Sequence, residues 1–305
     1  MRIAIVGAGA VGSYYGGILA RAGNEVVMLA RGEHLRALVE KGIEVHSPGE
    51  TFVARVEATA DPKSMGPADF AIVGVKTYSL AEVVPALRLL AEAGATIVPF
   101  LNGVDAAERL EEAGIPKERI LGGLTSVSVV RTGPGVVERR SPFQKVTVGE
   151  LGGGVSARAE SLGAAFREAG AEVTVSADIT ADLWRKLAFI ATMGAACGLS
   201  RSPIGGVRKT ALGALLIERA VREAFAVARA RGVNLAPDEE AKTLQFLASL
   251  GDGMKPSLLV DLEAGNRTEV EDLSGAISRL GRLTGVETPI HDTATAAIGA
   301  ASATA

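Results

Sequence analysis

The chain has 305 residues, of which 32 are basic and 35 acidic, and its formal net charge is −3. This length exceeds that of one ordinary domain, so we expect two domains, each able to bury an apolar core. The balanced charge, without a long run of one sign, argues against a nucleic-acid surface and against a polybasic membrane patch.

The first residues have the order of elements that is typical of a dinucleotide-binding fold. An apolar run over residues 2–6 leads into the motif GAGAVG at residues 7–12, a helical stretch follows, and a second apolar run covers residues 25–29. In such a turn Gly7 permits a tight bend, Gly9 lets the backbone approach a pyrophosphate, and Gly12 lets the helix lie close to the strand. Ala10 and Val11 add N–H groups at the helix start, where the dipole favours phosphate. We therefore predict cofactor contacts from these residues; the alternative is a glycine turn with only a structural role.

The end of the second apolar run bears on which dinucleotide binds. An NAD enzyme usually has Asp or Glu at the tip of this strand, where the carboxylate holds the ribose 2′-hydroxyl. Here neutral Ala30 is followed by Arg31. A guanidinium suits a 2′-phosphate because it forms charge-assisted, bidentate hydrogen bonds. Arg31 therefore predicts NADP(H) as the cofactor; the alternative is a solvated surface arginine.

Up to about residue 150, short apolar strands alternate with helical segments. We expect strands at residues 2–6, 25–29, 70–75, 96–100 and 120–124, and helices at residues 11–22, 34–40, 80–93 and 105–113. This alternation predicts a mostly parallel sheet with helices on both faces. Residues 42–58 alternate apolar and polar side chains and are predicted to form a hairpin-like insertion.

Beyond this region the chain is predicted to change character twice. Residues 131–150 are typical of antiparallel β with a turn in TGPG at residues 132–135, and a glycine loop, a helix at 155–169 and a strand at 172–175 follow. From residue 178 helical spacing dominates, at residues 182–197, 209–231, 237–250, 256–264 and 269–284. We predict an α/β protein with a Rossmann-type domain at residues 1–176, an all-helical domain at residues 177–305, and the active site in the cleft between them.

Several kinds of chemistry and location are disfavoured. The single cysteine, Cys197, cannot form an intramolecular disulfide, and its apolar neighbours predict a buried hydrophobe rather than a nucleophile. The three histidines, at positions 34, 46 and 291, form no ligand motif, so we predict no metal site. No signal-peptide pattern is present, and the longest apolar stretches, such as residues 187–199, are too short for a bilayer. We expect a soluble, cytoplasmic protein without a membrane partner, and its Ala-rich helices are compatible with a homodimer.

Two polar residues follow predicted strands. Lys76 ends the apolar run at residues 70–75, and ligands bind beyond the carboxyl ends of strands in open α/β sheets, so Lys76 is expected on the cofactor side. Asn102 follows the next strand, in FLNGV at residues 100–104. The alternative for Asn102 is a simple Asn-Gly turn.

Three residues of the helical part are candidates for chemistry. Lys186 lies in LWRKLAFIA at residues 183–191, where two adjacent cations must point differently. A lysine turned towards a cleft can act as a general acid because burial and neighbours tune its pKa; the alternative is a snorkelling surface lysine. Thr268 and Glu271 have the spacing of a capping box, which would place Glu269 in the first turn of a helix. Ser257 is likewise typical of a helix start.

In this order, the motifs resemble those of the ketopantoate reductase (2-dehydropantoate 2-reductase) family along essentially the whole chain. The shared features are the glycine motif with Arg31, Lys76 after a strand, LNG at residues 101–103, LWRKL at residues 183–187, and PSLLVD at residues 256–261 leading to TEV at residues 268–270. The resemblance implies NADPH-dependent reduction of a 2-oxo acid to a 2-hydroxy acid, in the family's case ketopantoate to pantoate for pantothenate and coenzyme A synthesis.

The resemblance also implies roles for individual residues. Lys186 matches the lysine that polarises the keto carbonyl and supplies the proton, which agrees with the need for a preorganised donor at the developing oxyanion. Glu269 matches an acid that contacts the substrate hydroxyl region, and Ser257 matches a hydroxyl that helps to hold the substrate. Asn102 and Lys76 match residues that line the site beside the nicotinamide.

One pair of positions departs from the family pattern. Many members carry asparagines four and eight residues after the catalytic lysine, where they hydrogen-bond the substrate, but this chain has Ile190 and Gly194. An isoleucine cannot replace an amide as donor or acceptor. Either other residues hold the substrate, with Arg201 or Ser202 as candidates, or the substrate is a different 2-oxo acid.

Two alternatives to a ketopantoate reductase therefore remain. One is another NADP-linked 2-oxo-acid or 3-hydroxy-acid dehydrogenase on the same fold. The other is a non-catalytic NADP(H)-sensing module, against which the joint presence of Lys186 and Glu269 argues, because a sensor needs neither.

Overall fold

The computed structural model describes residues 1–303, which divide into two compact units. The first unit comprises residues 1–101 and 105–179, and the second comprises residues 102–104 together with the chain from residue 180 onward. The short segment Asn102–Val104 therefore packs with the helical unit, although it follows a strand of the first unit.

A five-stranded parallel sheet forms the centre of the first unit. Its strand order is β5-β2-β1-β6-β7, and every neighbouring pair is parallel. The strands are β1 (Arg2–Val6), β2 (Glu25–Leu29), β5 (Glu57–Thr59), β6 (Phe70–Val73) and β7 (Thr96–Pro99). The central strands are nearly continuous apolar runs because both sheet faces are covered. The predicted Rossmann-type fold is confirmed, and β6 and β7 end earlier than expected.

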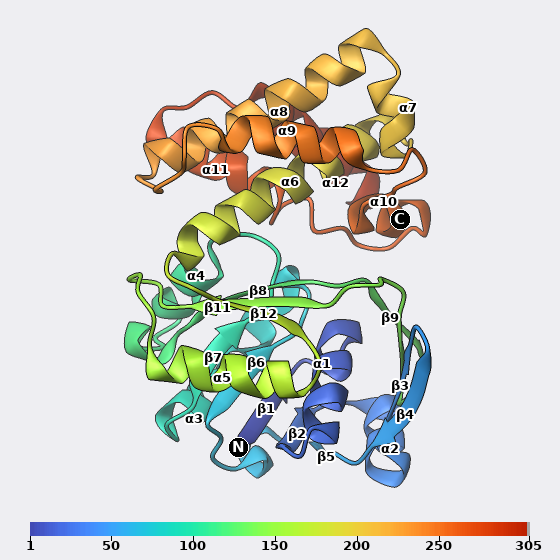
Figure 1. Cartoon of the computed structure of the whole chain (residues 1–305), viewed down its shortest axis with the longest axis vertical. Coiled ribbons are helices and arrows are strands. Elements are labelled where there is room, and N and C mark those ends of the chain that lie inside the picture. The colour runs from blue at the N-terminus through green and yellow to red at the C-terminus, as the bar shows by residue number, and fades with distance from the viewer. Residues whose placement is uncertain (304–305) are drawn as a thin grey trace. The chain divides into compact units, whose positions relative to one another are not determined.

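Helix α1 (Ala10–Arg21) lies between this sheet and a second sheet of order β4-β3-β10-β9 (Figure 1). The second sheet contains β3 (Ile43–Ser47), β4 (Glu50–Ala54), β9 (Val129–Gly133) and β10 (Val136–Arg139). Both predicted hairpins are confirmed, since β3 with β4 and β9 with β10 pair antiparallel. Covered on two sides, α1 is buried along most of its length, as expected of a helix between two layers.

A third sheet completes the first unit, with the order β12-β11-β8. It consists of β8 (Gly122–Ser126), β11 (Lys145–Gly149) and β12 (Glu172–Ser176), and α5 (Ala157–Glu168) packs on β11 and β12 (Figure 1). The strand expected at residues 120–124 thus begins at Gly122 and pairs antiparallel with β11, while Ile120 alone bridges the parallel sheet at Ile97. The other helices are α2 (Gly32–Lys41), α3 (Leu80–Glu92) and α4 (Ala106–Glu112), with 3₁₀ turns η1 (Pro62–Met65), η2 (Thr77–Ser79) and η3 (Lys117–Arg119).

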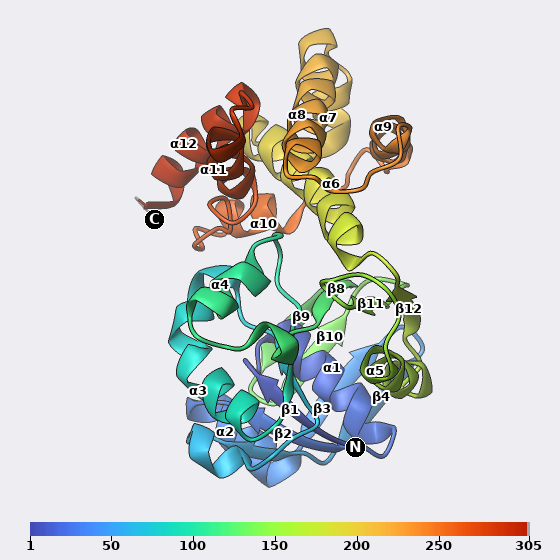
Figure 2. The ribbon, with the colours of Figure 1, turned by 90° about the vertical axis from the view of Figure 1, so that its left-hand side faces the viewer.

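The second unit is built from helices around one apolar core. The helices are α6 (Ile179–Ser200), α7 (Ile204–Arg208), α8 (Ala211–Ala230), α9 (Glu239–Ser249), α10 (Ser257–Glu263), α11 (Ser274–Thr284) and α12 (Pro289–Ala303). Helices α11 and α12 lie side by side, and both contact α8 (Figure 2). The predicted all-helical character is confirmed, and α7 and α12 are additional. Over residues 1–303, no helix combines the length and the apolarity that a membrane span requires.

The predicted capping box at the start of α11 is wrong. The helix begins at Ser274, and its N-cap residue Leu273 makes no side-chain capping bond. The Thr268 hydroxyl instead lies 3.0 Å from the Ser302 hydroxyl of α12. Glu269 therefore lies in a turn before α11 rather than in its first helical turn, and its carboxylate is available for other contacts.

Candidate active site

The glycine turn after β1 has the geometry of a phosphate cradle. Gly7 has a φ of 103°, and a Cβ there would lie 2.4 Å from Val75 Cγ1. A Cβ on Gly12 would lie 2.1 Å from the Gly7 carbonyl oxygen, so the helix can approach the turn only with glycine at this position. Gly9 is the N-cap residue of α1 and offers no side-chain cap. The first N–H groups of α1, which include those of Ala10 and Val11, are thus not capped by a side chain and suit a pyrophosphate.

A further glycine, which the sequence analysis did not select, completes this cradle. Gly74 directly follows β6, and a Cβ there would lie 2.9 Å from Gly12 Cα. In the observed strand order the direction of chain winding reverses between β1 and β6, and ligands bind at such a switch point beyond the carboxyl ends of the strands. Gly7 and Gly74 mark this point. The available signal was the glycine in IVGVK at residues 72–76, which interrupts the end of an apolar run.

Arg31 lies at the tip of the second strand, where dinucleotide-binding folds carry the residue next to the adenosine ribose. It follows the carboxyl end of β2 and is the exposed N-cap residue of α2, without a side-chain capping bond. Its neighbour Ala30 is buried and carries no carboxylate for a ribose 2′-hydroxyl. A neutral residue followed by a guanidinium at this tip, together with the glycine cradle, fits NADP(H). Lys76 is exposed and lies three residues beyond the carboxyl end of β6, which is the same edge of the sheet as the glycine cradle.

Lys186 of α6 lies in an environment that differs strongly from the solvent around an exposed lysine. The side chain is partly buried, and burial lowers the pKa of Lys186 to about 8, while the carboxylate of Glu269 opposes this shift. The adjacent Arg185 points to other partners, since its Nε donates to Glu239 Oε1 at 2.9 Å and its guanidinium also donates to Asp182 Oδ1 at 2.8 Å. The two neighbouring cations thus point differently, as predicted.

Glu269 is buried and is held by an amide from a distant part of the chain. Asn102 Nδ2 donates to Glu269 Oε2 at 3.1 Å, and only 5% of Glu269 is exposed. Gly103 has a φ of 107°, so the Asn-Gly pair also forms a turn that presents the Asn102 amide. Three residues that are far apart in the sequence, Asn102, Lys186 and Glu269, are thus linked by one hydrogen bond and one charge interaction within the second unit.

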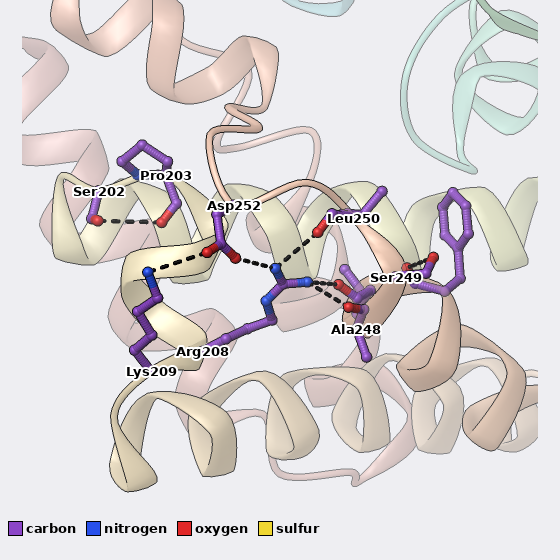
Figure 3. A network of polar contacts seen from close by, with 10 residues as sticks. Ser202, Pro203, Arg208, Lys209, Ala248, Ser249, Leu250 and Asp252 are labelled. Carbon is purple, nitrogen blue, oxygen red and sulfur yellow. Dashed lines mark hydrogen bonds and ion pairs between the residues drawn. The ribbon is translucent and has the colours of Figure 1, made fainter.

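Ser257 is the exposed first residue of α10, and the loop before it is fixed by Arg208 of α7 (Figure 3). The Arg208 guanidinium donates at 2.8 Å to the carbonyl oxygens of Leu247, Ala248 and Leu250, at the end of α9. It also donates to Asp252 Oδ1 at 2.7 Å, and this contact lowers the pKa of Asp252. An arginine that satisfies the last carbonyls of a helix also fixes where the next segment starts.

The two positions that lack the family asparagines form an apolar surface. Ile190 lies one turn beyond Lys186 and packs against the core of the second unit. A Cβ on Gly194 would lie 3.2 Å from Leu258 Cδ1, so the Leu258 side chain of α10 fills the space that a side chain at position 194 would take. No amide could be added at position 194 without displacing Leu258.

Arg201 and Ser202 cannot replace the missing amides. Both follow the carboxyl end of α6, and Arg201 is already fifteen residues after Lys186, which corresponds to about 22 Å along a helix. The Ser202 hydroxyl donates to the Pro203 carbonyl oxygen at 3.2 Å (Figure 3). Arg201 has a φ of 51° and ends the helix in the left-handed conformation. The sequence-based suggestion that these two residues hold the substrate is therefore wrong.

Three further features were considered as sites: the cysteine, a metal cluster and a surface pocket. Cys197 is buried, as predicted, and burial raises the pKa of its thiol to about 11. Within residues 1–303, no cluster of three His, Cys, Asp or Glu side chains could hold a metal ion. An open pocket of about 520 Å³ on α11 and α12 is lined by residues such as Ser278 and Arg282 and contains none of the candidate residues above.

Sequence comparisons identify the family. Residues 3–153 match the family Ketopantoate reductase PanE/ApbA, and residues 178–302 match its C-terminal part, Ketopantoate reductase PanE/ApbA C terminal. The chain belongs to the ketopantoate reductase family. The resemblance inferred from the motifs is confirmed, and both matched segments together cover most of the chain.

Relatives within this family differ in what they are named for. The chain is 34% identical to a 2-dehydropantoate 2-reductase of Halobacterium salinarum over 95% of each chain. Its fold is similar to that of a PanE/ApbA family ketopantoate reductase from Ralstonia eutropha, with a TM-score of 0.90, 28% identity and coverage of 100% of this chain and 99% of that chain. It is also similar to D-mandelate dehydrogenase solved with NADH and anilino(oxo)acetate, with a TM-score of 0.88, 28% identity and the same coverage. The chain is thus an oxidoreductase of a family that uses NAD(P)H.

Proposed function

We propose that this protein reduces a 2-oxo acid to a 2-hydroxy acid with NADPH and that its substrate is 2-dehydropantoate. The observation that carries the proposal is the partly buried Lys186, with a pKa of about 8, beside the buried carboxylate of Glu269. Bound NADPH would supply the hydride to the keto carbon. In this proposal residues 1–176 hold the cofactor, and residues 177–305 supply the substrate chemistry.

Lys186 has the properties required of the proton donor. As the carbonyl is reduced, negative charge develops on its oxygen, and a nearby ammonium both stabilises this charge and delivers the proton. With a pKa of about 8, Lys186 is mostly protonated at neutral pH and still releases its proton readily, which is the condition for efficient general acid catalysis. Glu269 favours the charged form of Lys186, and Asn102 orients Glu269 through its amide. Ser257 would help to hold the substrate.

The preference for NADPH rests on Arg31. A guanidinium at the carboxyl end of β2, next to buried Ala30, suits a 2′-phosphate and offers no acceptor to a ribose 2′-hydroxyl. D-mandelate dehydrogenase was solved with NADH, so this fold also accepts the coenzyme that lacks a 2′-phosphate. The glycine cradle serves the pyrophosphate of either coenzyme, whereas Arg31 distinguishes between them.

A second candidate substrate is a 2-oxo acid with a larger apolar side chain. Ile190, Gly194 and Leu258 offer an apolar surface where many family members have two amides. Ketopantoate carries a hydroxyl, which such a surface cannot hydrogen-bond, whereas a branched or aryl side chain could pack on it. The similarity to D-mandelate dehydrogenase, solved with anilino(oxo)acetate, points in the same direction.

The test is NADPH oxidation with purified protein against ketopantoate, 2-oxoisovalerate, phenylpyruvate and phenylglyoxylate. A kcat/KM for ketopantoate that exceeds the others by tenfold or more supports the first proposal, and higher values for the apolar acids support the second. Binding of NADPH without turnover of any 2-oxo acid, in either direction, would instead indicate a sensing module. Lys186→Met protein serves as the catalytic blank.

A further inference from the structure

His34 is a buried histidine of the first unit to which the proposed reaction assigns no role. It lies in the first turn of α2, three residues after Arg31, and is only 7% exposed. Its Nδ1 accepts a hydrogen bond from the Gly135 N–H at 2.9 Å, and its Nε2 lies 3.1 Å from the Ser13 hydroxyl oxygen. The Ser13 hydroxyl in turn donates to the Ala8 carbonyl oxygen at 3.0 Å.

The partners determine which atom carries each proton. A backbone N–H can only donate, so His34 Nδ1 must be the unprotonated nitrogen, and the proton is on Nε2. Nε2 then donates to the Ser13 oxygen, and the Ser13 hydroxyl donates to Ala8. These hydrogen bonds form one continuous series from the Gly135 N–H to the Ala8 carbonyl, in the middle of the glycine motif. Each member is buried, so each bond matters more than a solvated one.

Both ends of this series of hydrogen bonds are held by further contacts. Gly135 accepts a hydrogen bond from the Glu44 N–H at 2.8 Å through its carbonyl oxygen, and a Cβ on it would lie 2.9 Å from Ala37 Cβ of α2. The turn between β9 and β10 is therefore packed against α2 and linked to β3. At the other end, Ala8 lies between Gly7 and Gly9 of the phosphate cradle.

We propose that His34 is a positioning residue for the coenzyme, which links the glycine turn that faces the pyrophosphate to the helix that carries Arg31 at its N-cap. Because one imidazole fixes both segments, the pyrophosphate and 2′-phosphate contacts are placed relative to each other before the coenzyme binds, and such preorganisation increases affinity. This inference rests on the proposed binding of NADP(H). His34 itself touches neither the reacting atoms nor the substrate.

The link requires neutral His34, because an imidazolium has no acceptor for the Gly135 N–H. Burial lowers the pKa of His34, and the positive charge of Arg131 on the packed strand β9 lowers it further. The link is therefore intact at neutral pH and is lost in acid.

Four variants separate the two bonds. His34→Asn keeps an acceptor at the position of Nδ1 but loses the donor to Ser13, His34→Gln keeps the donor but loses the acceptor, and Ser13→Ala removes the relay hydroxyl. We expect each change to raise the Kd for NADP⁺, measured by titration calorimetry, by about 2- to 13-fold, the value of one hydrogen bond. The His34→Asn/Ser13→Ala double variant should have a smaller effect than the product of the two single changes. For the variants that turn over, kcat at saturating NADPH should stay within about twofold.

His291 provides the matched control. It is also buried, and its ring contacts the Ser274 hydroxyl at 3.1 Å and the Ala220 carbonyl oxygen at 3.0 Å, but it lies in the second unit. His291→Asn should lower the melting temperature to a similar degree as His34→Asn and leave the Kd for NADP⁺ unchanged. Equal losses of affinity in both variants would show that general destabilisation is the cause and would overturn the inference.

The Kd for NADP⁺ of the parent and of the His34→Asn protein is also measured over a range of pH, because a residue with only a structural role would not make their ratio depend on pH. The ratio of their Kd values for NADP⁺ should stay constant from pH 8 to pH 6.5 and fall towards one only at lower pH, because burial lowers the pKa of His34 and the parent loses the link when His34 is protonated. The series is therefore continued down to the lowest pH at which both proteins remain folded. Titration of the 2′-phosphate affects both proteins and cancels in the ratio. A constant ratio, or unchanged affinity in all His34 variants, overturns the inference alone. If the parent binds neither coenzyme, the proposed function fails with it.

Discussion

The two units of this chain build their parts of the proposed site in different ways. In the first unit most of the predicted cofactor contacts lie within one short stretch, from Gly7 to Arg31, where strand, turn and helix follow one another directly, and Gly74 completes the glycine cradle from the end of β6. In the second unit the reactive groups are side chains drawn from three separate segments, and Asn102, Lys186 and Glu269 meet only after folding. The cradle requires glycine where two backbone segments approach each other closely, whereas the second site depends on single functional groups.

This contrast predicts the largest effect for Lys186→Met. We expect kcat to fall by about 10²- to 10⁴-fold, the usual contribution of a general acid, with NADPH affinity unchanged. Since burial lowers the pKa of Lys186, the folded state binds this proton less tightly than the unfolded state, and the charge destabilises the fold below about pH 8. The variant should therefore gain about 1–3 kcal/mol in free energy of unfolding at pH 7, a gain that decreases between about pH 8 and pH 10.5.

The control for this change is Lys242→Met, which alters an exposed lysine of α9 that pairs with Asp238. It should leave kcat within about twofold and the stability within about 0.5 kcal/mol. Turnover of the Lys186→Met protein within threefold of the parent would mean that Lys186 is not the proton donor.

Arg31→Ala tests the first unit. Loss of a bidentate, charge-assisted contact should raise the KM for NADPH by roughly 10- to 150-fold and leave the KM for NADH little changed. Arg36→Ala, on the exposed side of the same helix, should change neither value. Steady-state kinetics with both coenzymes decide the point, and equal use of NADPH and NADH by the parent would contradict the role of Arg31.

Arg208→Met tests whether the loop before Ser257 is held from α7. Leaving the carbonyl oxygens at the end of α9 without their donor should lower the free energy of unfolding by about 1–3 kcal/mol. The KM for the 2-oxo acid should rise while the Kd for NADPH stays the same. Arg222→Met, which removes an exposed ion pair with Glu218, should change the stability by no more than about 0.5 kcal/mol. Equal effects of the two substitutions in urea denaturation would refute the positioning role of Arg208.

Ile190→Asn should produce the smallest effect. If a missing amide weakens ketopantoate binding, the variant should raise kcat/KM for ketopantoate by roughly 2- to 13-fold. An amide without a partner on this apolar surface would cost about 1–3 kcal/mol, so the melting temperature is measured alongside the kinetics. A variant as stable as the parent but slower with ketopantoate would show that position 190 already fits another substrate.

The contrast between the units also explains how far the sequence predicts the molecule. The parallel sheet, the glycine turn after β1 and the position of Arg31 after β2 were predictable because their pattern is local. The hydrogen bonds of His34 were not, since its partner Gly135 lies about a hundred residues further along the chain. The capping box at Thr268 was wrongly predicted because a tertiary contact with Ser302 takes its hydroxyl.

The helical unit was harder to predict in detail. Helix α12 was missed because its Ala, Thr and Gly residues show no apolar periodicity. Lys186 and Glu269 could be selected as a pair only through the family resemblance, since their spacing in the sequence carries no signal. Helix α6 is continuous from Ile179 to Ser200, and only this continuity shows that Arg201 lies far from Lys186.

The most direct test of the central claim is the pH dependence of kcat/KM for reduction of the best 2-oxo acid, in the parent and in Glu269→Gln protein. Lys186 must be protonated to donate, so the parent rate should be constant below its pKa and fall above about pH 8. Glu269 raises the pKa of Lys186, so the rate of the Glu269→Gln protein should begin to fall at a lower pH. A rate that is independent of pH between 7 and 9.5 in the parent, or the same profile in both proteins, would contradict the claim that Lys186 donates the proton under the control of Glu269.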